Sequence, residues 1–251
     1  MFSLADPRYS NPILSELQIK PEDQIISIRE NANADSNFII THLIKQFLYE
    51  KHKLCLVTFH SNVAHYQSVG KKLGYDLLSA KKNNEVIIID PINAMVEDVG
   101  KESGYLREDK DSLLKSLYLD IKKHLNTLLG NGDHQANLII DDLSHLVDLG
   151  VDVCQMINFT TYCLNLTNND KISVVLNNHV GNKIDEIVSN NLQYIANVHI
   201  EVSALKTGAS LDVTGSFTVE KDSRKRVFHY KAYDRGIKTF HPGESIYHLY
   251  K

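Results

Sequence analysis

Short apolar runs alternate with longer segments of helical periodicity along most of this chain. The apolar runs are rich in β-branched residues, which is typical of buried strands. They lie at residues 25–28, 53–59, 85–90, 136–143 and 171–179. The segments between them repeat apolar residues at helical spacing, at residues 38–48, 63–73, 112–129 and 152–167. This alternation predicts an α/β fold with a mostly parallel sheet that helices cover on both faces.

The two ends of the chain depart from this pattern. Residues 1–23 contain three of the five prolines and little periodicity, so we expect an irregular N-terminal arm there. From about residue 198 the chain carries short alternating segments separated by glycines and charged turns, at residues 198–202, 216–220, 226–231 and 238–241. They predict an antiparallel C-terminal extension of the sheet over about residues 198–251. We expect residues 24–251 to form one domain.

Charge and cysteine content narrow the class of protein. The net charge of −4 argues against nucleic-acid binding by the whole surface. Residues 203–251, however, carry nine basic against five acidic side chains, a net of +4. The three cysteines form no CxxC pair, and no signal peptide or long apolar run is present. We expect a reducing intracellular compartment, the cytoplasm with the nucleus left open, and no membrane partner.

The turn after the first strand lies where a nucleotide-binding domain places its phosphate loop. That loop needs two glycines, a lysine and a hydroxyl in the pattern G-x-x-x-x-G-K-[ST]. Here the eight positions read ENANADSN, with Glu30 and Asp35 at the glycine positions. Ser36 stands at the lysine position and Asn37 at the hydroxyl position. Two carboxylates repel phosphate and no cation offsets them, so the sequence predicts a degenerate phosphate loop.

The other parts of a nucleoside triphosphatase are weak or missing. Asp141 and Asp142 end a buried strand, where one acid can hold a magnesium shell, but aspartate before a helix also caps it and orders the loop. The second strand ends without the usual glutamate, and His60 is more often structural at such a place. We therefore expect no catalytic residues, no metal site, no cofactor and no autonomous ATP hydrolysis.

Over most of residues 24–180 the chain resembles the family of the sixth subunit of the Elongator complex. The resemblance rests on SNFIITHLIKQFLYEKHKLCLVTFHSNVAHYQSVGKKLG, on EVIIID and on LIIDDLSHLVDLG. It implies a RecA-like fold without working Walker motifs. It also implies a six-membered ring with two sister RecA-like subunits, two copies of each, which binds tRNA and docks on the catalytic Elongator core. The core modifies the wobble uridine of certain tRNAs, so the resemblance implies assembly and tRNA handling for this chain.

Candidate tRNA contacts are the cations of the C-terminal part. Cations interleaved with aromatic residues can neutralise phosphates and stack on bases. A further lysine lies after the fifth strand, in a loop that faces the channel of RecA-like rings. A solvated hairpin is the alternative interpretation of the C-terminal cluster. The candidates are Lys183, Lys221, Arg224, Lys225, Arg226, Lys231 and Arg235.

The degenerate nucleotide site is also a candidate subunit interface. In rings of this type the site lies between neighbours, so residues 30–37, with Asp141 and Asp142, are expected to contact another subunit. Glu30 and Asp35 can then receive an arginine in place of phosphate. Two alternative functions stay open: a RecA-type ATPase with an unusual phosphate loop, and a pure assembly scaffold without nucleic-acid contact.

Overall fold

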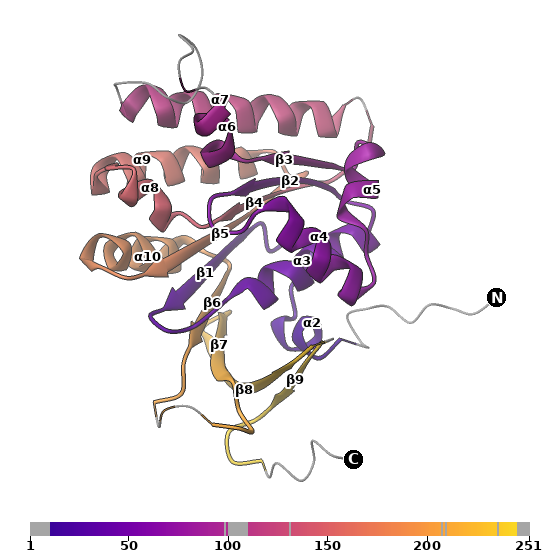
Figure 1. The fold of residues 1–251 in the computed structure, drawn as a ribbon, viewed down its shortest axis with the longest axis vertical. Coiled ribbons are helices and arrows are strands. Elements are labelled where there is room, and N and C mark those ends of the chain that lie inside the picture. Colours follow the sequence, from indigo (N-terminus) through magenta and orange to yellow (C-terminus); the bar gives the residue numbers. More distant parts are fainter. Residues whose placement is uncertain are drawn as a thin grey trace, which may run out of the picture.

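In the computed structural model the strands build one sheet of nine, in the order β3-β2-β4-β5-β1-β6-β7-β8-β9 (Figure 1). The structure describes residues 11–97, 99, 110–130, 132–206, 208, 210–234 and 236–244. The first six strands are parallel, and the last three are antiparallel. Their bounds are β1 Ile25–Asn31, β2 Lys53–Thr58, β3 Val86–Ile89, β4 Ala136–Asp141, β5 Ile172–Val180, β6 Val198–Ser203, β7 Gly215–Lys221, β8 Arg224–Tyr233 and β9 Gly236–Phe240.

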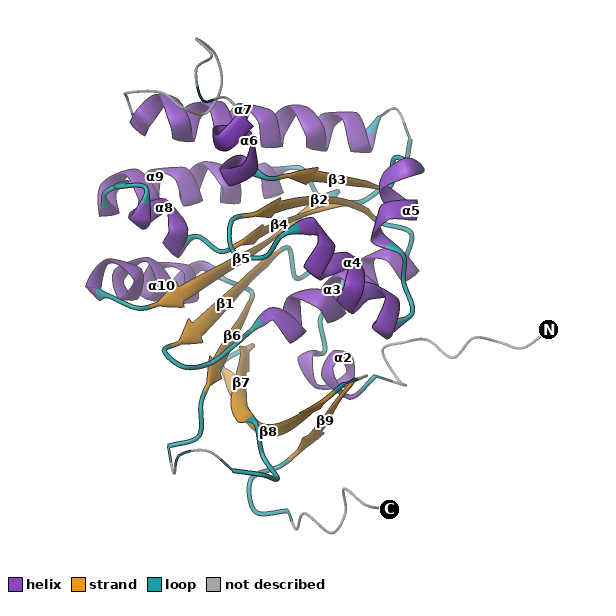
Figure 2. Cartoon of the chain, in the orientation of Figure 1, coloured by secondary structure: helices purple, strands orange, loops and turns teal. Residues whose placement is uncertain are grey.

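Helices cover both faces of the sheet, as Figure 2 shows. One layer contains α7 (Lys110–Leu129), α8 (Ser144–Asp148), α9 (Val153–Leu164) and α10 (Lys183–Ile195). The other contains α2 (Pro12–Leu17), α3 (Asn37–Tyr49), α4 (Val63–Leu73) and α5 (Leu77–Lys82). Helix α6 (Pro91–Glu97) follows β3, and a 3₁₀ turn (Asn165–Asn168) follows α9. The predicted α/β architecture is confirmed.

The continuous apolar strands are explained by burial on both faces. In β2, Cys55 and Val57 point into the core below α7 and α9, whereas Leu54 and Leu56 point into the core below α3 and α5. All four side chains are fully buried. Burial of each large aliphatic side chain contributes about 1.5–3 kcal/mol relative to exposure, so every strand residue has a packing role.

The N-terminal arm is not irregular throughout. Residues 12–17 form α2, and its apolar side chains Ile13, Leu14 and Leu17 are buried in the core. Asn11 caps the helix by accepting the backbone N–H groups of residues 13 and 14, and proline is favourable at the first helical position. The prediction is wrong for these residues, because a helix of six residues is too short to show a helical period in the sequence. Residues 1–10 lie outside the described residues.

The antiparallel extension begins later than the sequence predicts. β6 pairs in parallel with β1, and only β7 to β9 run antiparallel. A short alternating strand at residues 198–202 has the same pattern in either orientation, which explains the error. In β8 the predicted alternation is present, since Phe228 and Tyr230 are buried whereas Lys225 and Val227 are exposed.

Candidate functional site

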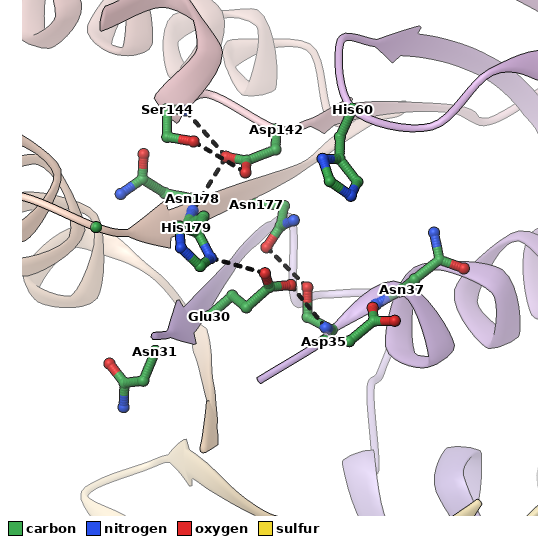
Figure 3. A network of polar contacts seen from close by, with 12 residues as sticks. Glu30, Asn31, Asp35, Asn37, His60, Asp142, Ser144, Asn177, Asn178 and His179 are labelled. Atoms are coloured by element: carbon green, nitrogen blue, oxygen red, sulfur yellow. Dashed lines mark hydrogen bonds and ion pairs between the residues drawn. The ribbon is translucent and has the colours of Figure 1, made fainter. Parts of the chain in front are cut away.

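The carboxyl ends of β1, β4 and β5 meet beside the loop that joins β1 to α3 (Figure 3). This is the edge of a parallel sheet at which ligands usually bind. The predicted site residues come together here, and a chain of hydrogen bonds links them. Side chains and backbone N–H groups of the loop and of the strand ends form these bonds.

Glu30 stands at the centre of the loop. Its Oε2 accepts the backbone N–H of Ser36 at 2.7 Å, and its Oε1 lies 2.8 Å from His179 Nδ1. In a working phosphate loop, backbone N–H groups of this kind hold the phosphate. The Glu30 side chain is only 16% exposed. A carboxylate of the chain therefore takes the place of an external anion.

Ser36 links the loop to the buried acid at the end of β4. Ser36 is fully buried, and its Oγ donates to Asn177 Oδ1 at 3.1 Å. Asn177 Nδ2 donates to Asp141 Oδ1 at 2.8 Å, and the Tyr66 hydroxyl donates to Asp141 Oδ2. Burial raises the pKa of Asp141, against the opposite effect of these two hydrogen bonds. Both oxygens of Asp141 are thus engaged inside the protein.

Asp142 orders the loop that follows β4. Its Oδ1 accepts the backbone N–H groups of Ser144 at 2.9 Å and His179 at 3.0 Å, and its Oδ2 accepts the Ser144 hydroxyl at 3.0 Å. For Asp141 and Asp142 the sequence left two roles open, magnesium binding and loop ordering. The contacts of Asp142 support loop ordering. Among the residues that the structure describes, no group of three or more His, Cys, Asp or Glu side chains is arranged to hold a metal ion.

Burial restricts which site residues can form an interface. Ser36, Asp141 and Asp142 are at most 4% exposed, so their side chains offer little surface for the predicted contact with another subunit. Glu30 is engaged by the contacts described above and is a poor acceptor for an incoming arginine. Asp35 is exposed, and its Oδ1 accepts the local backbone N–H of Asn37 at 2.8 Å.

Three participants were missed in the sequence. Tyr66, Asn177 and His179 complete the network, and His179 lies opposite Glu30 in the register of β1 and β5. The available signal was the position of Asn177 and His179 at the end of a buried strand, because parallel strands bring such ends to one edge. His60 contacts His145 instead, with ring nitrogens 3.2 Å apart.

Lys221 has a structural partner. Its ammonium group forms an ion pair with Asp23, and the two side chains are 9% and 7% exposed. It also donates to the Gln18 carbonyl at 2.9 Å. The lysine therefore fixes β7 to the segment before β1. A buried, paired cation is poorly placed to neutralise an external anion, so these contacts support a structural role for Lys221 over the predicted phosphate contact.

Other cations of the C-terminal hairpin also have intramolecular partners. Lys225 Nζ lies 2.6 Å from Glu220 Oε1, and Lys231 donates to the carbonyl of Leu211. The Arg226 guanidinium lies 5.9 Å from the ring centroid of a phenylalanine on its own strand. These contacts reduce, but do not remove, the charge that the hairpin presents.

Two further candidates are also exposed. Arg224 is the first residue of β8, directly after the turn from β7, and Lys183 is the first residue of α10. They lie on different elements, so the structure does not gather all the predicted cations into one surface. Arg235 lies outside the described residues.

Comparisons with known proteins agree over nearly the whole chain. The family model described as Elongation complex protein 6 matches residues 11–235. Elongator complex protein 6 of Danio rerio is 27% identical over 249 residues, which cover 90% of this chain and 92% of the relative. The Homo sapiens protein of that name is 24% identical over 258 residues, which cover 94% and 97%.

A solved structure shows the same fold. A KaiC-like protein from Pyrococcus horikoshii superposes with a TM-score of 0.57 over 92% of this chain and 96% of its own, at 13% identity. The mostly parallel sheet with antiparallel C-terminal strands is therefore RecA-like. Among the described helices, none has the length and apolarity that crossing a bilayer requires.

Proposed function

The chain belongs to the Elongation complex protein 6 family, and we propose that it is a non-catalytic RecA-like subunit of the six-membered ring of Elongator. In this role it assembles with two sister RecA-like subunits and docks on the catalytic core. The ring supports tRNA binding and modification of the wobble uridine in the cytoplasm, with the nucleus left open. The observation that carries this assignment is the family match over residues 11–235.

The geometry of the loop supports a non-catalytic role. Phosphate binding requires free backbone N–H groups and a cation, whereas here Glu30 accepts the N–H of Ser36 and no lysine is present in the loop. Asp141, the remaining candidate for a magnesium shell, is held by a tyrosine and an asparagine. A RecA-type ATPase needs these groups to be free.

A pure scaffold is the second candidate, and one observation favours it. Lys221, Lys225 and Lys231 all have partners within the chain, so the basic cluster is less available than its sequence indicates. The two functions differ in whether this subunit contacts tRNA. We assign the tRNA contact first to Arg224, because it is exposed and directly follows the β7–β8 turn.

The test is filter binding of tRNA by the assembled ring, with charge reversal at Arg224. A tRNA-binding subunit predicts several-fold weaker retention for Arg224→Glu, and each lost phosphate contact also lowers the salt dependence. The matched control is Lys122→Glu, an exposed lysine on α7. Intact assembly with unchanged retention for both variants supports the scaffold, whereas failure of the wild-type chain to join a ring contradicts both.

A further inference from the structure

One helix layer of the fold carries most of its unbalanced positive charge. Residues 37–85 contain seven lysines, no arginine and three acidic side chains, a net of +4. The rest of the chain contains 20 basic and 28 acidic side chains, a net of −8. The positive segment forms α3, α4 and α5 together with β2. This layer therefore differs in sign from the remainder of the molecule.

Four of these lysines lie in the last turns of two consecutive helices. Lys71 and Lys72 are in α4, Lys81 and Lys82 are in α5, and all four are exposed. Neither helix contains an acidic residue. Within the described part of the chain, none of the four ammonium groups forms an ion pair or a hydrogen bond. They are more available to an external anion than the paired lysines of the β7–β8 hairpin.

The nearest carboxylate in sequence is already engaged. Asp76 caps α5, and its Oδ1 accepts the backbone N–H of Ser79 at 2.9 Å and the Gln67 side-chain amide at 3.1 Å. These hydrogen bonds lower the pKa of Asp76 more than the charge of Lys71 does. Glu85, after α5, is half-buried. The two acids reduce the positive charge of the helix ends without cancelling it.

Lys72 has acidic neighbours of its own. It borders a hollow that the exposed carboxylates of Asp35 and Asp234 also line, so part of its charge is offset there. We leave it out of the set for this reason. The remaining three, called the lysine surface below, are Lys71, Lys81 and Lys82.

The neighbouring side chains indicate which class of anion this surface fits. In α4 and α5, Leu78 is the large apolar side chain with substantial exposure, at 42%, and Ser79, Asn83 and Asn84 are exposed polar residues. Protein interfaces have apolar, aromatic centres in which lysine is depleted. Lysine, serine and asparagine side chains are common contacts of nucleic-acid phosphates. RNA is therefore favoured over an acidic protein.

We propose that the lysine surface contacts the sugar–phosphate backbone of RNA, as a second contact distinct from that of Arg224. Helix α5 packs against β3, at the opposite end of the sheet from β8 (Figure 1). The two strands are seven positions apart, about 34 Å at the usual strand spacing. A folded RNA can touch both places, whereas a single nucleotide cannot. The inference rests on the proposed function only for the choice of tRNA as the RNA.

The first test titrates the assembled ring with labelled tRNA at several salt concentrations. The variant Lys71→Gln/Lys81→Gln/Lys82→Gln should bind at least tenfold more weakly. The slope of log affinity against log salt concentration should fall by about one for each lost phosphate contact. Unchanged affinity and slope overturn the inference. If only Arg224→Glu weakens binding, the inference fails and the proposed function stands.

The matched control removes three exposed lysines from the other helix layer. Lys115→Gln/Lys122→Gln/Lys123→Gln changes α7 and should leave affinity and slope unchanged. Equal losses in the two triple variants would show a general effect of net charge and overturn the proposed surface.

A charge-preserving variant separates phosphate contact from helix stability, because lysines near helix ends also interact with the helix dipole. Arginine at all three positions of the lysine surface keeps the charge and should restore wild-type binding. If this variant binds as weakly as the glutamine variant, the loss does not come from charge, and the inference is overturned.

The full chain outside the ring decides between RNA and protein. An RNA hairpin should shift the backbone amide signals of the lysine surface in NMR spectra, and poly-L-glutamate of equal charge should bind at least fivefold more weakly. Equal binding of the two polyanions, or no shift at these residues, overturns the inference. If no ring assembles, the proposed function fails, and this titration still decides on the surface.

Discussion

The Glu30 Oε1 atom lies 2.8 Å from His179 Nδ1, and the contact joins the ends of two neighbouring parallel strands. The other oxygen of Glu30 accepts the loop N–H at Ser36. The chain thus supplies its own anion where a nucleotide-binding relative of this fold receives phosphate. A loop closed in this way needs no ligand to hold its conformation.

Removal of this carboxylate should destabilise the fold. Glu30→Ala leaves the buried N–H of Ser36 without an acceptor, so we expect the free energy of unfolding to fall by about 1–3 kcal/mol. Glu30→Gln keeps an acceptor oxygen and should cost less. Urea denaturation measures both, with Glu22→Ala as the control, because the Glu22 side chain is 68% exposed. Equal losses for Glu30→Ala and the control would show that the contact does not stabilise the loop.

Tyr66 should matter more as the pH rises. Tyr66→Phe removes a donor from the buried Asp141 carboxylate, with an expected cost of about 1–3 kcal/mol. Burial raises the pKa of Asp141, so as the pH falls this carboxyl group binds a proton more readily in the folded chain than a carboxyl group in water does. We therefore expect a larger loss near pH 8 than near pH 5. Tyr194→Phe, at a side chain 91% exposed, is the control. A pH-independent loss would contradict this explanation.

His199 should contribute to loss of stability in mild acid. It is buried, with Nδ1 2.7 Å from Ser27 Oγ, and burial lowers its pKa from the usual value of about 6.5. The unfolded chain binds this proton more readily, so the stability conferred by the neutral ring is present above about pH 6.5 and is lost below it. Unfolding measured from about pH 7.5 to 5 should show a smaller decline for His199→Gln. The exposed His134→Gln should keep the wild-type decline, and an identical decline in both variants would refute the prediction.

Substitutions at Lys221 and Arg224 should have different effects, the first on stability and the second on tRNA binding. Lys221→Ala leaves Asp23 buried without its cation, with an expected cost of about 3–5 kcal/mol. Arg224→Ala changes an exposed residue at the start of β8 and should alter stability by less than about 0.5 kcal/mol. Urea denaturation and tRNA retention by the ring measure the two effects. Equal stability of the two variants would remove the structural role assigned to Lys221.

Much of the fold follows from local pattern. Burial on both faces makes parallel strands continuously apolar, as residues 54–57 of β2 and 138–140 of β4 show. Gly74 ends α4 with a backbone φ of 90°, as a helix-terminating glycine should, and Asn62 caps the start of the helix. The sequence missed α2 because six residues are too few to show a period.

The site depends on contacts between distant parts of the chain. The degenerate loop could be recognised from Glu30 and Asp35, since residue type alone excludes phosphate there. The contact between Glu30 and His179 that closes the loop could not be predicted, because the two residues are 149 positions apart in the sequence. The same limit applies to Lys221, whose partner Asp23 is 198 residues away. A count of cations in sequence says nothing about which of them are already paired.

Native mass spectrometry of the assembly purified gently from its own cells tests the central claim most directly. We expect a hexamer with two copies each of this chain and two other RecA-like subunits. When this chain is ejected from the ring, it should have the mass of the polypeptide alone. A monomer, a homo-oligomer, or an ejected chain that carries a nucleotide would contradict a non-catalytic ring subunit.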